Sequence, residues 1–255
     1  MTESKMNIAI IGYGKMGHEI EKISKAKGIN VVSVIDPDDT NASYREINDK
    51  SMQNVDVCVD FTTPDTVINN IKKIAIFKKN IVVGTTGWYG HIDEVKSIVK
   101  KNGIGLIYAS NFSIGVNIFF KIIEDAAKII DKVDAYDVYG YELHHNKKID
   151  SPSGTAKTIG EILTKNIKRK NKMVFDKIDR KIESNQLHFA SVRAGSIPGT
   201  HIVGFDSSAD TIELTHTARN REGFALGAII AAEWIKNKKG FYDINHMMKN
   251  IVGGS

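Results

Sequence analysis

Residues 142–156 hold the densest group of reactive side chains in the sequence, and they read ELHHNKKIDSPSGTA. Two imidazoles can exchange protons near neutral pH, and a lysine supplies fixed positive charge for a carboxylate or a developing anion. The Ser-Gly-Thr run predicts a helix start, whose unpaired N–H groups can hold a second carboxylate. We therefore expect a site for a compact dianion with a proton donor nearby. Its candidate residues are His144, His145, Lys148, Ser153, Gly154 and Thr155.

The members of this group also have plainer interpretations. Ser153 could be an ordinary N-cap, and His145 a structural histidine held by hydrogen bonds. His144 and His145 are adjacent, so on an extended backbone their side chains point to opposite faces, and no zinc motif surrounds them. We therefore predict no metal ion at this site.

A glycine-rich turn, Gly12-Tyr13-Gly14-Lys15-Met16-Gly17, follows a short apolar run and precedes a helical pattern. Two of its glycines allow a sharp turn and a close approach of backbone N–H groups to a pyrophosphate, and the third allows tight packing of helix on strand. Asp36 follows about 20 residues later, where an acid can bind the adenosine ribose. This pattern predicts dinucleotide binding, although a purely structural turn would also use glycine.

Asp36 is followed by Pro37 and not by an arginine. A carboxylate disfavours the 2′-phosphate of NADPH, which an adjacent arginine would accommodate. The sequence therefore favours NADH over NADPH, unless a lysine from elsewhere intervenes. The alternative is that residues 36–39 form only a turn.

Two further loops, residues 61–64 and 84–87, follow predicted strands and combine small hydroxyl residues with glycine or proline. Ligands of open α/β sheets lie at such strand ends, and small residues allow the backbone to approach a ribose or a nicotinamide. Helix capping and turn formation explain the same residues equally well.

The elements that position these residues follow from hydrophobic periodicity. Short apolar runs alternate with amphipathic stretches over about the first 110 residues, which predicts a doubly wound parallel sheet. Strands are expected at 7–11, 30–35, 55–61, 80–83 and 104–108, and helices at 18–27, 66–78 and 92–101. Beyond residue 111 the pattern predicts a helix at 117–130, a strand at 135–143, a helix at 154–167, strands within 186–216 and an apolar helix at 224–235. The strand-rich part suits a second domain with a mostly antiparallel sheet.

Composition limits the class of protein. Hydrophobic residues make up 42% and charged residues 25% of the 255 residues, which excludes a disordered or fibrous chain. One cysteine excludes a disulfide framework, and no apolar run approaches the roughly 18 residues that cross a bilayer. Residues 1–6 lead into a strand without the core of a signal peptide. We expect a cytoplasmic protein without a membrane partner.

The formal net charge of +5 comes from one segment. Residues 165–181 hold eight basic and two acidic residues, which leaves 27 basic against 28 acidic residues elsewhere. We interpret this segment as a solvated helix end and loop. No nucleic-acid partner follows from it.

Four blocks of sequence resemble the dihydrodipicolinate reductase family. They are the glycine-rich turn at 12–17, the GTTGW run at 84–88, the SNFSIGVN run at 110–117 and the block at 142–156, and the SVRAG run at 191–195 and residues 214–227 extend the likeness over nearly the whole chain. The sequence departs from the commonest bacterial pattern in a glycine turn that is one residue shorter and in Pro37, where an arginine often follows the ribose acid.

This resemblance implies a nicotinamide-dependent reduction that gives tetrahydrodipicolinate for diaminopimelate and lysine biosynthesis. It implies that His144 is the proton donor, that Lys148 is the essential lysine, and that His145, Lys148, Gly154 and Thr155 hold the substrate carboxylates. The implied cofactor residues are Gly12, Tyr13, Gly14, Lys15, Met16, Asp36, Gly84, Thr85, Thr86, Ala109, Ser110, Asn111 and Phe112.

The resemblance also implies an organisation. A Rossmann-type dinucleotide-binding domain would span 1–112 and be completed by 222–255, and an α+β substrate-binding and oligomerisation domain would span 113–221 of a homotetramer. The alternatives are another two-domain amino-acid dehydrogenase and a dinucleotide sensor without turnover.

Overall fold

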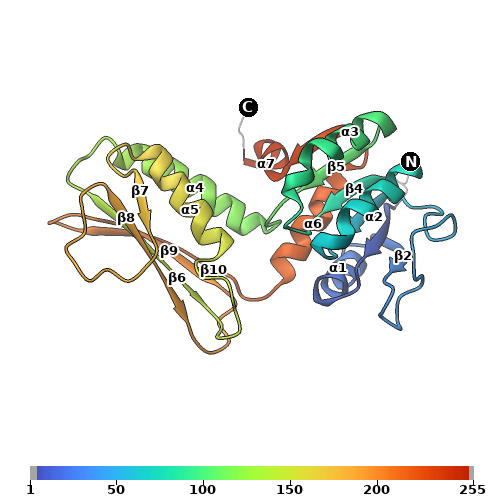
Figure 1. The fold of residues 1–255 in the computed structure, drawn as a ribbon, viewed down its shortest axis with the longest axis horizontal. Helices are drawn as coiled ribbons and strands as arrows, with labels where there is room; N and C mark the ends of the chain where they lie inside the picture. The colour runs from blue at the N-terminus through green and yellow to red at the C-terminus, as the bar shows by residue number, and fades with distance from the viewer. Residues whose placement is uncertain (1–4, 253–255) are drawn as a thin grey trace. The chain divides into compact units, whose positions relative to one another are not determined.

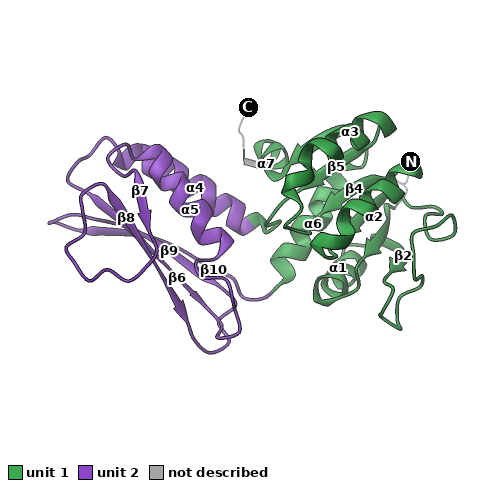
Figure 2. Ribbon diagram, viewed as in Figure 1, with its two compact units in different colours: residues 1–114, 221–255 green, residues 115–220 purple. Residues whose placement is uncertain are grey.

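The computed structural model describes residues 5–252, and residues 1–4 and 253–255, which fall within the predicted first domain, lie outside that range. The chain divides into two compact units: unit 1 comprises residues 1–114 and 221–255, and unit 2 comprises residues 115–220 (Figure 2). Each unit has a sheet of its own. Among the described residues no helix has the length and apolar character needed to cross a membrane.

Six parallel strands form the sheet of unit 1 (Figure 1). Its strands are β1 (Asn7–Ile11), β2 (Asn30–Ile35), β3 (Val57–Asp60), β4 (Asn80–Val83), β5 (Gly105–Tyr108) and β11 (Gly240–Asp243). They lie in the order β11-β5-β4-β3-β1-β2, so the chain order reverses at β1, which pairs with β2 on one side and β3 on the other. Ligands of open α/β sheets bind at the carboxyl ends of strands beside such a reversal.

Helices cover both faces of this sheet. They are α1 (Lys15–Ala26), α2 (Pro64–Ile76), α3 (Ile92–Asn102), α6 (Glu222–Ile235) and α7 (Ile244–Val252), with a short 3₁₀ turn η1 (Tyr89–His91) before α3. The α1 and α6 helices pack on each other, as do α2 and α3. Neighbouring strand residues such as Ile10 and Ile11 are both buried, which requires cover on both faces. The predicted doubly wound sheet is confirmed.

The last strand and helix of this unit were not predicted from the sequence. The apolar helix expected at 224–235 is α6, and it packs on β3, β4 and β5. The chain then adds β11 as an edge strand beside β5, followed by α7. A four-residue strand that directly follows a lysine-rich turn is too short to show a period in the sequence.

Unit 2 is a five-stranded sheet in the order β10-β9-β6-β8-β7 with two helices. Its elements are α4 (Ile114–Ile130), β6 (Asp137–His144), α5 (Gly154–Asn166), β7 (Lys172–Val174), β8 (Gln186–Arg193), β9 (Thr200–Asp206) and β10 (Thr211–Thr217). The expectation of a mostly antiparallel sheet was only half correct: β6 pairs with β9, and β9 with β10, in antiparallel fashion, but β6–β8 and β7–β8 are parallel. The segment that contains α5 is long enough to carry the chain back across the sheet, which parallel pairing requires.

Both helices of unit 2 cover one face of its sheet (Figure 1). Apolar residues of α4 such as Ile123 and of α5 such as Ile159 form a single core with Phe189 of β8 and Phe205 of β9.

The basic segment at 165–181 is not wholly solvated. Its interpretation as a solvated helix end and loop was therefore partly wrong. Lys170 is 2% exposed, and its Nζ donates to Gln186 O at 2.9 Å and lies 2.6 Å from Asp137 Oδ1. The segment also contains β7. A buried lysine is tolerated here because its ammonium has both an anionic partner and a carbonyl partner.

Candidate functional site

The residues predicted to bind a nucleotide all lie in unit 1, where strands end. Residues 12–16 follow β1, Asp36 follows β2, residues 84–86 follow β4 and residues 109–112 follow β5. Parallel strands place their carboxyl ends along one edge of the sheet, so these four segments share that edge.

The glycine-rich turn fits a nucleotide in its detail. Gly12 has φ +86°, and a Cβ there would lie 2.4 Å from the carbonyl oxygen of Phe61. A Cβ on Gly17 would lie 2.4 Å from the oxygen of Gly12, so this glycine allows α1 to pack closely on the turn. By contrast, a Cβ on Gly14, the N-cap of α1, would meet no protein atom within 4 Å. The N-terminus of α1 is therefore open to an anion.

Asp36 is tied to this turn by backbone hydrogen bonds. Its Oδ2 accepts the N–H of Tyr13 at 2.7 Å, and its Oδ1 accepts the N–H groups of Asp38 and Asp39 at 2.9 and 3.0 Å. Burial alone would raise the pKa of the Asp36 carboxyl, but these N–H groups outweigh that effect and hold the pKa below its usual value. Arg45, which was not predicted as a site residue, lies in the same loop, and its Nη1 donates to Asp39 O at 2.6 Å.

A buried carboxyl group, Asp60, organises two of the strand-end loops. Its Oδ1 accepts the hydroxyls of Thr62 and Thr85 at 2.8 and 2.9 Å, and its Oδ2 accepts Asn70 Nδ2 at 2.9 Å. Thr62 N also donates to Thr85 Oγ1 at 2.8 Å, which joins the loops after β3 and β4 directly. Burial raises the pKa of Asp60, because its partners are neutral and compensate desolvation only in part.

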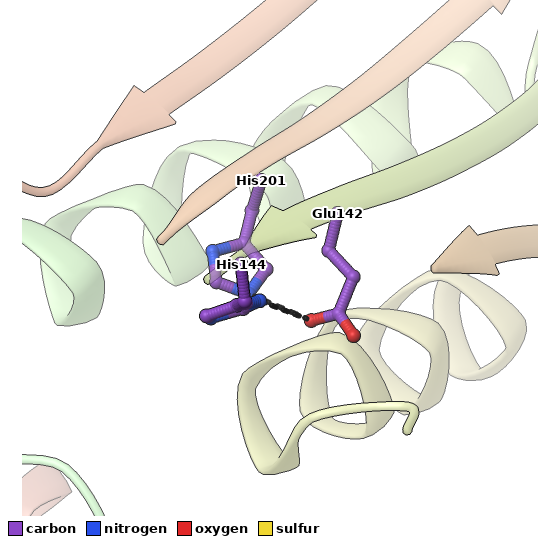
Figure 3. Close-up of side chains that lie close together, drawn as sticks. All are labelled: Glu142, His144 and His201. Atoms are coloured by element: carbon purple, nitrogen blue, oxygen red, sulfur yellow. Dashed lines mark ion pairs between the residues drawn. The ribbon is translucent and has the colours of Figure 1, made fainter. Parts of the chain in front are cut away.

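The predicted proton donor lies in unit 2 at the end of β6. Side chains two residues apart on a strand share a face, so Glu142 and His144 both point to the buried face that α4 and α5 cover. The strand register places His201 of β9 and Ser191 of β8 on either side of Glu142, and Arg193 beside His144. Figure 3 shows both imidazoles turned toward the carboxylate.

Glu142 is fully buried, and its two oxygens have different partners. Oε1 accepts Ser153 N and Ser191 Oγ, each at 2.9 Å, and Arg193 Nη2 at 2.8 Å. Oε2 lies 3.3 Å from both His144 Nδ1 and His201 Nε2. Burial alone would raise the pKa of Glu142, but its interactions with His201, Ser153 and Arg193 outweigh that effect and hold the pKa far below its usual value.

His144 is buried and lies among charges of both signs. Burial lowers its pKa to about 4. The Glu142 carboxylate opposes this shift, whereas His201, Lys148 and Arg193 add to it. In the free protein His144 is therefore a neutral imidazole at pH 7.

The other predicted residues, Lys148 and His145, differ in how they relate to the Glu142–His144 pair. Lys148 Nζ pairs with Asp150 at 2.7 and 2.9 Å, so a substrate carboxylate would exchange with Asp150. His145 is half-buried, and its Nδ1 has no hydrogen-bond partner among the described residues. The structure therefore brings His144 and Ser153 together through Glu142, while His145 lies outside that network.

The helix start predicted at Ser153 is the N-terminus of α5. Ser153 caps the helix by accepting Ala156 N at 3.1 Å, and its Oγ lies 3.2 Å from His201 Nε2. The first intrahelical bond is Lys157 N to Ser153 O, so the N–H groups of Gly154 and Thr155 precede it and have no intrahelical acceptor. A Cβ on Gly154 would meet no protein atom within 4 Å, which leaves room for an anion.

Four residues of this network were missed as site residues from the sequence: Glu142, Arg193, Gly199 and His201. Gly199 has φ +151°, and a Cβ there would lie 2.9 Å from His144 Nε2. The alternation along β6 could have placed Glu142 beside His144. Only the strand register, which no local pattern encodes, could have added the others.

Glu142, His144 and His201 also form a set of ligand atoms within 4.8 Å of one another that could hold a cation. The Arg193 guanidinium and the Ser153 N–H already balance the carboxylate, so the cluster needs no cation for charge neutrality.

Two family models together match most of the chain. The model described as dihydrodipicolinate reductase, N-terminus, matches residues 6–112, and the model for the C-terminus matches residues 115–248. A 4-hydroxy-tetrahydrodipicolinate reductase of Christiangramia forsetii is 40% identical over 247 residues, which cover 96% of this chain and 99% of the relative. Another, from Buchnera aphidicola subsp. Schizaphis graminum, is 40% identical over 237 residues, or 90% of this chain and 82% of the relative.

Solved structures agree on the fold. A dipicolinate-bound dihydrodipicolinate reductase from Paenisporosarcina sp. TG-14 superposes with a TM-score of 0.78 at 23% identity and covers 96% of this chain and 100% of that one. A probable dehydrogenase from Thermotoga maritima has a TM-score of 0.58 at 13% identity, with 89% and 88% of the two chains covered.

Proposed function

The chain belongs to the dihydrodipicolinate reductase family and is an NAD(P)H-dependent oxidoreductase that forms tetrahydrodipicolinate, and from this premise we propose the residues that perform the reaction. The sequence left two alternatives, an amino-acid dehydrogenase and a sensor without turnover. Neither is required, because the family matches cover most of the chain. The observation that carries the proposal is the buried His144–Glu142 pair beside the N-terminus of α5.

The nucleotide is held by unit 1. The open N-terminus of α1 at Gly14 and Lys15 binds the pyrophosphate, and Asp36 accepts hydrogen bonds from the adenosine ribose. The loops at 84–86 and 109–112, the first of them anchored by Asp60, lie against the nicotinamide end. When bound, the nicotinamide supplies the hydride.

The cofactor is preferentially NADH. The Asp36 carboxylate stays ionised, because three backbone N–H groups lower its pKa, and it repels a 2′-phosphate. Arg45 Nη1 is already engaged with Asp39 O, so a phosphate would compete for it. Substrate-dependent oxidation measured with each nucleotide should give the higher kcat/KM with NADH, and a higher value with NADPH would overturn this preference.

The dicarboxylate substrate is held by unit 2. One carboxylate accepts the N–H groups of Gly154 and Thr155 at the start of α5, with Ser153 fixing that start. The other binds Lys148, which releases Asp150, together with His145. A dianion held in this way fixes the ring against its reactive neighbours.

His144 supplies the proton. Reduction of the conjugated imine ring adds a hydride and a proton, and the protonated His144 gives its proton to the carbon or nitrogen that gains electron density. A dianion beside His144 offsets the positive charges of Lys148 and Arg193, which lower its pKa in the free protein. Replacing His144 with Gln or Lys148 with Met should depress kcat with folding intact, and near-normal turnover in both variants would refute these assignments.

A homotetramer that works in the cytoplasm completes the proposal. The helices of unit 2 cover one sheet face only, and the other carries Val192, 45% exposed, and the stacked rings of Tyr139 and Tyr141. Light scattering on the eluting protein should give four times the 28.2 kDa of one chain, and the mass of one chain would refute the tetramer.

A further inference from the structure

Glu142 holds three segments of unit 2 together through one oxygen. Oε1 accepts Ser153 N at the start of α5, Ser191 Oγ in β8 and the Arg193 guanidinium. Arg193 Nη2 also donates to Asp150 O at 2.7 Å, so the loop that carries Lys148 is fixed through the same guanidinium. Three donors saturate this oxygen as an acceptor.

The second oxygen faces imidazoles. Oε2 lies at ion-pair distance, 3.3 Å, from His144 Nδ1 and from His201 Nε2, and among the described residues neither Oε2 nor His144 Nδ1 has a hydrogen-bond partner. A neutral imidazole carries one N–H, and an ionised carboxylate can only accept. The proton of His144 is therefore stabilised on Nδ1, where it faces Oε2.

The opposite edge of the His144 ring lies beside Gly199. Nε2 points toward Gly199, where a side chain would lie 2.9 Å away and is lacking. A proton that a protonated imidazole carries on Nε2 can leave toward this edge, whereas the proton on Nδ1 stays on the carboxylate side.

We propose that Glu142 is the positioning residue of the reductase site: its Oε2 fixes the tautomer and orientation of His144 so that Nε2 delivers the proton, while its Oε1 holds the start of the substrate-binding helix in register with that ring. This inference rests on the proposed role of His144 as donor. Glu142 touches neither substrate nor nucleotide and acts through His144.

A purely structural role for Glu142 predicts a different outcome. A buried carboxylate that only tied β6 to β8 and α5 would affect folding and substrate binding, and it would leave the ionisation of the donor unchanged. A positioning role couples the charge of Glu142 to the protonation of His144. The groups that face His144 are Glu142 of β6, Arg193 of β8, His201 of β9 and Lys148 of the following loop.

The test is Glu142→Gln, which keeps the size and removes the charge. We expect kcat to fall by about 10²-fold with little change in the substrate KM. Without the negative charge the imidazolium is less stable, so the loss of kcat on the alkaline side should move to lower pH. The matched control is Glu161→Gln, an exposed glutamate of α5, and it should match the unmodified enzyme.

Arg193→Gln tests the same link with the opposite sign and does not depend on the first variant folding. Removing the guanidinium leaves the Glu142 charge less balanced, so the alkaline limb of kcat should move to higher pH. An unmoved alkaline limb in either folded variant, or movement in the wrong direction, would overturn the positioning role. His144→Gln in the same assay separates this inference from the proposed function. Full turnover in His144→Gln would refute the assignment of His144 as the proton donor. Lost turnover in His144→Gln, together with unmoved alkaline limbs in Glu142→Gln and Arg193→Gln, would refute only the positioning role of Glu142.

Discussion

Two fully buried carboxyl groups, one in each unit, are held in opposite ways. Asp60 of unit 1 accepts hydrogen bonds from Thr62, Thr85 and Asn70, all of them neutral. Glu142 of unit 2 has a guanidinium on one oxygen and two imidazoles near the other. Burial raises the pKa of Asp60, whereas the partners of Glu142 outweigh burial and lower its pKa.

The difference indicates that Asp60 has a structural role and that Glu142 has an electrostatic one. Asp60 joins two loops of the nucleotide edge with hydrogen bonds that do not need a permanent charge. Glu142 supplies a permanent negative charge beside a titratable ring, which is what a proton donor requires if it is to be charged near neutral pH. We therefore propose that unit 2 supplies the proton and that unit 1 binds the nucleotide.

The largest effect should come from removing the ring that Glu142 faces. Replacing His144 with Gln should lower kcat by about 10²–10⁴-fold, the usual contribution of a general acid. The KM for the nucleotide should stay unchanged, because the residues proposed to bind the nucleotide belong to unit 1. His91→Gln, an exposed histidine of unit 1, is the matched control. Equal turnover in both variants would mean that unit 2 does not hold the donor.

Crowding the same ring without altering its chemistry should cost less. In Gly199→Ala the new Cβ would lie 2.9 Å from His144 Nε2 and displace the ring, so we expect kcat to fall by about 10²-fold. Gly195→Ala also places alanine at positive φ, +50°, but meets no atom within 4 Å. It therefore controls for an alanine at a positive-φ glycine of unit 2 that does not approach His144. If both variants lose the same activity, proximity to Nε2 is not the cause.

The two carboxyl groups should also respond oppositely to pH. The lowered pKa of Glu142 stabilises the folded protein above the usual value of 4.5, and this contribution is lost as the pH falls through the lower folded value. The raised pKa of Asp60 makes the folded protein less stable as the pH rises from 3.8 through the higher folded value.

Denaturant unfolding of Glu142→Gln and Asp60→Asn between pH 3 and 7 measures this contrast. The penalty of Glu142→Gln should grow with rising pH toward about 3–5 kcal/mol, the usual result of leaving a buried charge unpaired. The penalty of Asp60→Asn should shrink over the same range. If the destabilisation of the two variants changed with pH in the same direction, the pKa values of the two carboxyl groups would not be shifted in opposite directions.

The smallest effect should come from a single neutral donor. Ser191→Ala removes one hydrogen bond to Glu142 Oε1 and leaves Arg193 and Ser153 in place. Because the acceptor is ionised, we expect a loss of about 1.5–3 kcal/mol in the free energy of unfolding, with kcat far less affected than in His144→Gln. A fall in kcat as large as that of His144→Gln would place Ser191 in the reaction itself.

Local patterns in the sequence located most of unit 1 and part of the site. The strands predicted at 7–11, 30–35 and 80–83 agree with β1, β2 and β4 to the residue, because strands buried on both faces are apolar throughout. His144, Lys148 and Ser153 were recognisable because their chemistry lies within one short segment.

What the sequence did not provide depends on pairing between distant strands. His201 and Arg193 enter the site only because β9 and β8 flank β6 in one particular register. The parallel half of the unit 2 sheet was missed for the same reason, since strand direction is set by the path of the chain through α5. Lys170 was predicted to be solvated, because its partner Asp137 is distant in the sequence and no local pattern indicates that the two residues pair.

We propose that His144 becomes the charged donor when a dianion joins the Glu142 cluster. Nuclear magnetic resonance titration of His144, assigned by comparison with His144→Gln, tests this with and without dipicolinate. The pKa of His144 should be about 4 in the free protein and rise when dipicolinate binds, because two carboxylates offset the cations around the ring. A pKa that stays near 4 in the saturated complex would contradict the account.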